Sequence, residues 1–248
     1  MNTNSDLQDN LSKEEIARLI IDYFHRTMMH HALWFAEVQH QFGREKAMKI
    51  MESAYKQSYD IQMKRLAKTF GFEMKDDIPA PLMNFSKEEL NKLKENVAVN
   101  WLANDGVWFQ AVENAFGMFD AKRCNDSCWA QFSPFEAWSI KKLLKLPENN
   151  GLEGLKKALQ MRLYASINNQ EINEETANSF VFRMIDCRVQ SARKRKGLND
   201  YPCKSAGIVE YRSFADSIDS RIKTECLGCP PDNHPENYYC SWKFSITK

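Results

Sequence analysis

The last quarter of the chain contains cysteines whose spacing could bind a metal ion. Cys226 and Cys229 form a C-x-x-C pair with a glycine inside it, and Cys240 follows eleven residues after Cys229. A C-x-x-C turn lets two thiolates converge on one ion, and Cys203 would complete a set of four sulfur ligands. Zinc suits such a closed, all-sulfur set, which indicates a structural role. An iron–sulfur cluster uses the same ligands and stays open as an alternative.

A second set of residues combines carboxylates, histidines and aromatic side chains, the usual lining of a small-molecule pocket. Asp105 and Glu113 are eight residues apart, about two helical turns, so both could face one cleft. The expected pocket residues are Trp34, Glu37, Trp108 and Phe109, and the candidate acid–base groups are Asp105, Glu113, His30 and His31. The alternative, with the aromatic side chains in the core and the acids in solvent, is equally compatible with the pattern.

Composition limits the partners of the protein. The chain has 248 residues, seven cysteines and a net charge of +1, and no export signal is visible. We therefore expect a cytoplasmic protein with free or metal-bound thiols. No run approaches the roughly 18 apolar residues of a membrane helix. One short basic run, at 193–196, gives little support for nucleic-acid binding. A small-molecule ligand is the expected partner, and a homodimer stays open.

The elements that carry these residues show an internal repeat. The tetrapeptide Ser-Lys-Glu-Glu begins at Ser12 and again at Ser86. Each copy is a capping box, which predicts the start of a helix. Residues 12–47 and 86–121, compared without a gap, share eleven identities in 36 positions. This pattern predicts a duplicated helix-turn-helix unit.

The chain after the repeats changes to a mixture of strand and helix patterns. Alternating apolar residues predict strands at 180–187, 222–226 and 237–246, with a helix at 203–219 and another at about 152–166. Ser133-Pro134 is expected to interrupt the second helix of the second repeat. The expected organisation is a disordered tail over 1–11, a duplicated helical region over 12–166 with repeats at about 12–70 and 86–146, and a cysteine-rich α+β metal-binding module over 167–248.

The cysteine-rich end resembles the end of the 4-vinyl-reductase-type small-molecule-binding domain. Cys203, then Cys226-x-x-Cys229, then Cys240-Ser-Trp-Lys-Phe carry this resemblance. Members of that family can bind zinc through a cysteine, an acid-x-x-Cys pair and a further cysteine. Here Cys226 stands where the acidic ligand would be, with Glu225 beside it, so the resemblance leaves the second ligand open. Cys187 could also replace one ligand.

The whole chain is similar to an uncharacterised family of prokaryotic cytosolic proteins. Its motifs are D-G-x-W-F-x-x-V-E, here Asp105 to Glu113, and E-C-x-x-C-P-P-D-x-H-P, here Glu225 to Pro235. The layout is loosely similar to L-2-amino-thiazoline-4-carboxylic acid hydrolase-like proteins. The repeat and the strand and helix patterns predict the α+β fold class, with a duplicated helical N-terminal half packed on a C-terminal module that has a small antiparallel sheet. The resemblance implies that this module is 4-vinyl-reductase-like.

The main functional hypothesis is a cytosolic protein with one structural zinc and a small-molecule pocket. The first alternative is a hydrolase of a small heterocyclic or amide substrate, in which Asp105, Glu113 and His30 or His31 act as acid and base. The second alternative is an iron–sulfur protein.

Overall fold

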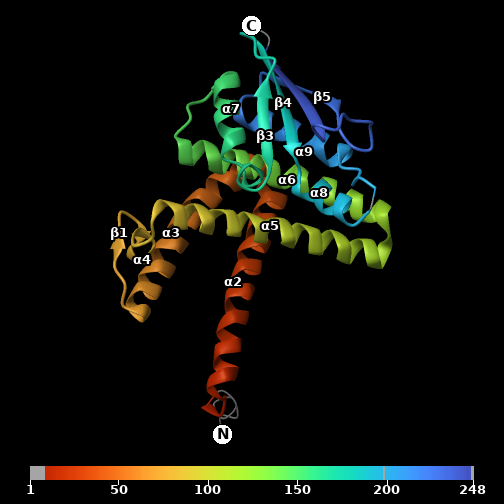
Figure 1. Cartoon of the computed structure of the whole chain (residues 1–248). Coiled ribbons are helices and arrows are strands. Elements are labelled where there is room, and N and C mark those ends of the chain that lie inside the picture. The colour runs from red at the N-terminus through yellow and green to blue at the C-terminus, as the bar shows by residue number, and fades with distance from the viewer. Residues whose placement is uncertain (1–8, 198, 247–248) are drawn as a thin grey trace. The chain divides into compact units, whose positions relative to one another are not determined.

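The computed structural model describes residues 9–197 and 199–246, so residues 1–8 of the predicted tail lie outside the described residues (Figure 1). The chain divides into two compact units, which we call unit 1 (Met1–Asn84) and unit 2 (Phe85–Lys248). Helices and small antiparallel sheets are both present, which confirms the α+β class. In the described part of the chain, every helix is too short or too polar to cross a membrane.

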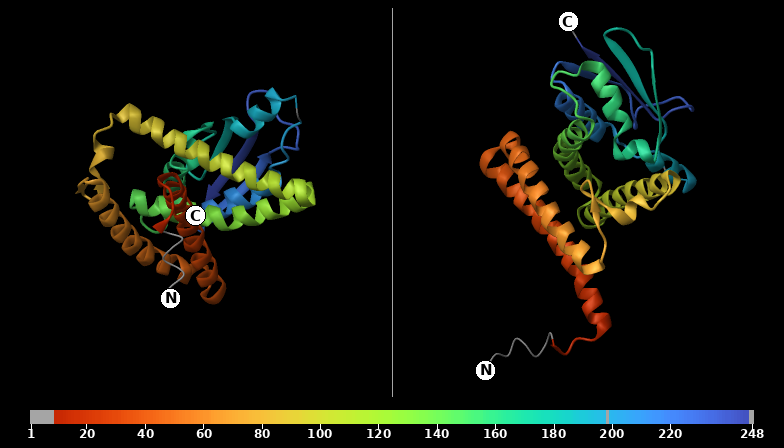
Figure 2. Two further views of the ribbon diagram at one scale, coloured as in Figure 1. Left: turned by 90° about the horizontal axis from the view of Figure 1, so that it is seen from below. Right: turned by 90° about the vertical axis from the view of Figure 1, so that its left-hand side faces the viewer.

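Unit 1 is a helical hairpin followed by a small β-hairpin. Helices α2 (Lys13–Phe42) and α3 (Arg44–Phe70) pack side by side (Figure 2). The Glu15 N–H donates to the Ser12 hydroxyl at 3.3 Å, and the Ser12 N–H donates to the Glu15 carboxylate at 2.8 Å. This is the capping box that the sequence predicted. The remaining elements are β1 (Met74–Lys75), β2 (Ile78–Pro79) and α4 (Ala80–Met83).

Unit 2 begins with a helical hairpin of the same dimensions. Helices α5 (Lys87–Phe116) and α6 (Met118–Leu144) have 30 and 27 residues, as α2 and α3 have. The bounds of both helices are shifted from their counterparts by the offset that separates Ser12 from Ser86. Gly43 (φ 80°, ψ 163°) and Gly117 (φ 89°, ψ 170°) separate the two helices of each hairpin. These angles are accessible almost only to glycine, which explains why the turn falls at this residue in both hairpins.

The predicted interruption at Ser133-Pro134 is wrong, because α6 continues through Pro134. A proline inside a helix lacks one backbone donor and crowds the carbonyl four residues earlier, so the local preference opposes the helix. Tertiary packing overrides it. Pro134, Ala137 and Ile140 are buried, and α6 lies along α9 (Lys204–Ile218) in the largest interface between helices of unit 2.

The second half of unit 2 is a four-stranded antiparallel sheet with short helices. The strands are β3 (Asn169–Asn173), β4 (Ser179–Asp186), β5 (Ile222–Gly228) and β6 (Cys240–Ile246), in the spatial order β3-β4-β6-β5. The helices are α7 (Gly151–Gln160), a 3-10 helix η1 (Leu163–Ser166) and α8 (Arg188–Arg195). The three predicted strands and the predicted helix at 203–219 are present. Strand β3 was not predicted, since its residues are mostly polar.

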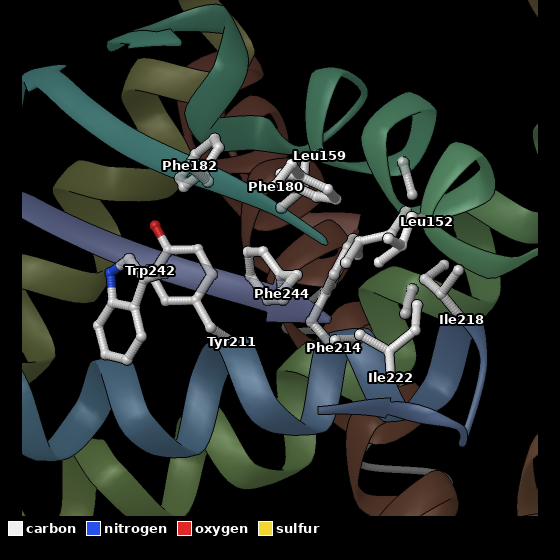
Figure 3. Packing of buried hydrophobic residues seen from close by; sticks show 14 of the residues in the cluster. Leu152, Leu159, Phe180, Phe182, Tyr211, Phe214, Ile218, Ile222, Trp242 and Phe244 are labelled. Atoms are coloured by element: carbon white, nitrogen blue, oxygen red, sulfur yellow. The ribbon is translucent and has the colours of Figure 1, made fainter. Parts of the chain in front are cut away.

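The core of unit 2 lies between the sheet and α9. Phe180 of β4 faces Phe244 of β6, and Phe182 faces Trp242, so large rings fill one side of the two central strands. Tyr211 of α9 lies against these rings, with centroids 4.7 Å from Trp242 and 5.6 Å from Phe182. Figure 3 shows the side chains of α9 directed at the sheet. On its other side α9 packs against α6, so helix, helix and sheet form successive layers.

The division between the units falls after Asn84, whereas the sequence suggested a boundary near residue 166. The reason is long-range packing. Helix α6 packs against α9 and α7, and α5 packs against η1, so the second hairpin belongs with the sheet.

Candidate metal and ligand site

Three cysteine sulfurs meet where α9 begins. Cys203 is the N-cap of α9, Cys229 directly follows β5, and Cys240 is the first residue of β6. The sulfur atoms of Cys203 and Cys229 are 3.4 Å apart, and the Cys229 thiol also hydrogen-bonds to Cys240. Cys229 and Cys240 are buried and Cys203 is half-buried. The structure therefore brings together three of the four predicted ligands, from three different elements.

The fourth predicted ligand, Cys226, lies on β5 opposite Trp242 and packs against the same core. The preceding residue, Glu225, pairs with Lys243 and is exposed, because successive strand residues point to opposite faces. This placement favours Cys226 over Glu225 as a neighbour of the other sulfurs. Cys187, the N-cap of α8, is half-buried and also packs against this core.

The thiols contact one another directly. Two sulfurs on one tetrahedral zinc, each about 2.3 Å from the ion, would be about 3.8 Å apart, which is longer than the distance between Cys203 and Cys229. Within residues 9–197 and 199–246, no group of three or more histidine, cysteine, aspartate or glutamate side chains has the arrangement of a metal site. The hydrogen bond between the two thiols lowers the pKa of Cys203 and raises the pKa of Cys229, so the loss of a proton from both thiols is opposed.

A set of polar contacts holds the backbone around these cysteines. The Lys204 N–H donates to the Pro230 carbonyl at 2.8 Å, and the Lys204 ammonium pairs with Asp232 at 2.7 Å. The buried Gln190 amide donates to the Tyr201 carbonyl at 2.9 Å and accepts from the Tyr201 N–H at 2.8 Å. These contacts join α8, the start of α9 and the β5–β6 connection, so the position of Cys203 does not depend on the cysteines alone.

Beside Cys229, the backbone of α9 at Gly207 comes close to the ring of Trp242. A Cβ atom added at Gly207 would be 2.7 Å from Cζ2 of Trp242 and 3.8 Å from the Cys229 sulfur. Only glycine lets α9 come this near to β6. The missing side chain thus places the first turn of α9 against the cysteines.

A second group of candidate residues lies along one face of α5, one helical turn apart. Trp101 contacts Tyr164 of η1 with ring centroids 5.0 Å apart, and Phe109 contacts Tyr201 at 5.2 Å. Asp105 lies between them in sequence and is half-buried. In the described part of the chain, Asp105 has no cationic partner, and burial raises the pKa of its carboxyl. An unpaired, partly buried carboxyl beside aromatic side chains makes Asp105 a candidate for binding a ligand.

The aromatic cluster around Trp101 extends onto α6. Trp129 is buried, stacks on Tyr164 at 5.6 Å and meets Trp101 edge to face at 5.9 Å, while Phe132 lies 5.8 Å from Trp101. Sequence reasoning missed Trp101, Trp129, Phe132 and Tyr164. The spacing of four residues from Trp101 to Asp105 and from Asp105 to Phe109 was the available signal, because it puts all three on one helix face.

An open groove of about 710 Å³ lies outside this region, between α6 and the start of α9. Lys122, Asp126, Lys204 and Ile208 are among its lining residues. Lys122 lies over the Tyr201 ring, 4.8 Å from its centroid, and the same ring contacts Phe109.

The other predicted pocket residues are exposed or half-buried. Trp34 and Trp108 are exposed, as are His30, His31 and Glu37. Phe109 is half-buried at the aromatic cluster, and Glu113 is half-buried one turn before the end of α5. The candidates for one pocket fall in different units. Unit 1 contains His30, His31, Trp34 and Glu37, and unit 2 contains Asp105, Trp108, Phe109 and Glu113.

The fold and the site define an α+β protein with a cysteine cluster beside an aromatic, acid-containing interior. The chain belongs to the family of unknown function DUF6125, whose model matches residues 8–87 and 82–246. This finding agrees with the expected membership of an uncharacterised family, while the two motifs and the likeness to 4-vinyl-reductase-type domains stay predictions. The two matched stretches nearly coincide with units 1 and 2. No curated protein matches the chain.

Among solved structures, the chain is similar to the crystal structure of the phenol-responsive sensory domain of the transcription activator PoxR with phenol. The match covers 58% of this chain and 73% of that chain, with 14% sequence identity and a TM-score of 0.41. A likeness at this level establishes neither a shared fold nor a shared ligand.

Proposed function

We propose that unit 2 is a small-molecule-binding module whose cysteine end is held by one structural zinc ion. The observation that carries the proposal is the contact among Cys203, Cys229 and Cys240, with Cys226 packed against the same core. The resemblance of this stretch to the zinc-binding end of 4-vinyl-reductase-type domains supports the same ligand set.

The residues fit zinc by their chemistry. Thiolates are the preferred ligands of structural zinc, and a bound cation would remove the repulsion that opposes a second thiolate in the cluster. Zinc would supply this charge and would cross-link the start of α9, the end of β5 and the start of β6. Four sulfur ligands leave no open coordination position, so the ion would stabilise the fold and take no part in a reaction.

Elemental analysis of untagged protein tests the zinc. We expect about one zinc per chain, and removal of the metal by a chelator should lower the melting temperature by about 10 °C or more. The reason is that metal binding and folding are coupled, and a chain of this size loses about 2–4 °C per kcal/mol. Added zinc should restore the melting temperature. Iron together with visible absorbance would assign an iron–sulfur cluster instead, and folded, metal-free protein whose melting is unaffected by chelator would refute the metal site.

The ligand would lie against Asp105 and the aromatic clusters of α5. Asp105 offers a carboxylate without a cationic partner in the described part of the chain, and the rings of Trp101, Phe109 and Tyr164 offer apolar walls. A small molecule with an apolar body and a hydrogen-bond donor or a positive charge complements this arrangement.

The substitution Asp105→Asn tests whether Asp105 is kept for binding rather than for stability. We expect a free energy of unfolding at pH 7 higher than in the wild type by an amount on the order of 1 kcal/mol, because a neutral amide of the same shape is less unfavourable to bury than a carboxylate. Burial raises the pKa of Asp105 in the folded protein. The folded state therefore binds the proton more tightly, and the wild type loses stability as the pH rises past the unfolded pKa. The difference between variant and wild type should vanish at about pH 3.

Glu113→Gln is the matched control, two turns further along the same helix. It should change the free energy of unfolding by less than about 0.5 kcal/mol, as expected for a substitution outside a buried network. Chemical denaturation at acidic and at neutral pH measures both variants. A loss of stability in Asp105→Asn at neutral pH would show that the carboxylate stabilises the fold, contrary to a ligand role.

A further inference from the structure

Two cysteine sulfurs of unit 2 lie close enough to react with each other. The sulfur atoms of Cys203 and Cys229 are 3.4 Å apart, and both residues are free thiols. A disulfide joins two sulfurs at about 2.05 Å, so an approach of about 1.4 Å, which rotation of the two side chains can supply, separates this contact from a bond. Both residues belong to unit 2, so their separation is a property of one compact unit.

Backbone contacts that do not involve sulfur keep the two cysteines together. The N–H of Lys204, the residue after Cys203, donates to the carbonyl of Pro230, the residue after Cys229, at 2.8 Å. The side-chain amide of Gln190 donates to the Cys203 sulfur at 3.5 Å. The two segments are therefore already held side by side before any bond forms, which is the pre-organisation that favours an intramolecular reaction.

We propose that Cys203 and Cys229 are a redox-active pair, which a low-molecular-weight disulfide such as oxidised glutathione converts into a disulfide bond. Cys203 reacts first, because it is half-buried whereas Cys229 is buried. Its sulfur attacks one sulfur of the small disulfide, whose S–S bond breaks, and the proton of Cys203 passes to the released thiol. Cys229 then attacks the Cys203 sulfur, closes the protein disulfide and gives its proton to the second released thiol. Two electrons pass from the protein thiols to the small disulfide.

A second pair of cysteines in unit 2 shows why contact matters more than exposure. Cys124 and Cys128 of α6 are both exposed, so reagents reach them more easily than they reach Cys203. They are four residues apart in one helix, where Cβ atoms are about 5–6 Å from each other, whereas a disulfide needs about 3.5–4.5 Å. Cys229 instead has a high effective concentration at Cys203. The internal disulfide therefore forms at the buried cluster.

The consequence for a metal rests on the proposed zinc site. Zinc binds thiolates, and a disulfide bond between Cys203 and Cys229 would remove two of its four ligands, so oxidation would release the ion. The new bond would join the start of α9 to the segment after β5, which are two of the elements that zinc would link. Oxidation thus exchanges one cross-link for another, and unit 2 would stay folded while zinc is released.

Thiol mapping of the full chain tests the pair. Metal-free, reduced protein is equilibrated in buffers of reduced and oxidised glutathione, quenched with acid, alkylated and digested. We expect mass spectrometry to find peptides linked through Cys203 and Cys229, at least about tenfold more abundant than an internal disulfide between Cys124 and Cys128. Cys124→Ser should keep the Cys203–Cys229 disulfide, and in urea its preference over other pairs should disappear.

Three results would overturn the redox pair. They are mixed disulfides with glutathione alone at every buffer ratio, a main internal disulfide between other cysteines, and a preference for Cys203–Cys229 that persists in urea, which would show that folding does not create it. Circular dichroism checks the fold of the metal-free chain, and zinc-loaded protein is mapped in the same buffers if that chain unfolds.

Zinc-loaded protein also separates the redox pair from the zinc site. We expect about one zinc per chain to reach a chromogenic chelator in step with the disulfide. A chain that binds no zinc yet forms the Cys203–Cys229 disulfide would refute the metal and support the redox pair. A chain that holds zinc and never forms this disulfide would overturn the redox pair and support the metal. Zinc that stays bound after the disulfide has formed would overturn its release by oxidation.

Discussion

Replacing Arg162 by methionine is expected to lower the free energy of unfolding by about 3–5 kcal/mol, because two carboxylates would lose their buried cation. Arg162 is almost fully buried. Its Nε donates to Glu136 of α6 at 2.8 Å, and its Nη2 lies 2.7 Å from Glu210 of α9 in an ion pair that falls outside hydrogen-bond geometry. Burial alone would lower the pKa of Arg162, but the two carboxylates more than offset it, so the guanidinium stays charged. Burial also raises the pKa of Glu210.

The position of this group in the fold explains the size of the effect. Arg162 lies between α7 and η1, so the triad with Glu136 and Glu210 joins this connection to both layers of helix beneath the sheet. The guanidinium also lies over the Phe214 ring, 4.8 Å from its centroid. Loss of the cation would leave two acids in a region with little access to water.

Chemical denaturation measures the effect against two controls. Arg183→Met removes a half-buried arginine that pairs with the exposed Glu174, and a pair with an exposed partner contributes about 1 kcal/mol or less. Adding Glu136→Gln and Glu210→Gln to Arg162→Met should recover much of the loss, since the triple variant buries no unpaired charge. A loss below about 1 kcal/mol in Arg162→Met would contradict the assignment of a buried ionic network.

The second large effect is expected for Cys229→Ser. If zinc holds the cysteine cluster, the variant loses the metal and at least about 3 kcal/mol of stability, because the ion links α9 to the sheet only when its ligands are complete. Cys229 contacts two other thiols and is buried, which makes it the central member of the cluster. The exposed Cys124 supplies the control: Cys124→Ser should change stability by less than about 0.5 kcal/mol and retain the zinc.

A chelator separates the loss of metal from the loss of packing. A serine hydroxyl in this apolar cluster is itself unfavourable by about 1–3 kcal/mol. With the metal removed from both proteins, the difference between wild type and Cys229→Ser should shrink to this smaller amount. A difference that is the same with and without chelator would mean that Cys229 contributes by packing alone.

Several elements followed from short stretches of sequence. Ser12 and Ser86 with their glutamates mark both helix starts, and Gly43 and Gly117 mark the turns, because each signal depends on a few neighbouring residues. The strands β4, β5 and β6 were found through alternation of apolar and polar residues. The cysteine spacing pointed to Cys203, Cys226, Cys229 and Cys240, and the thiols of Cys203, Cys229 and Cys240 are in contact.

The failures share one physical cause. Pro134 opposes a helix locally, and α6 persists because α9 covers its buried face. The aromatic interior of unit 2 forms around Trp101 and Trp129, which the sequence did not single out. Which face of an apolar helix is covered depends on partners that are distant in the chain, and a local pattern holds no information on them.

The sequence by itself therefore determined where most of the helices and strands begin and end, the repeat, the α+β class and the cysteines that could share an ion. Capping, turn conformation and strand alternation act within a few residues, so they can be read locally. Only the tertiary structure decided that the second hairpin joins the sheet, that Asp105 lies half-buried between two aromatic clusters, and that Glu225 faces away from the cysteines. These are outcomes of packing between distant elements, where burial of whole faces outweighs the preference of any single residue.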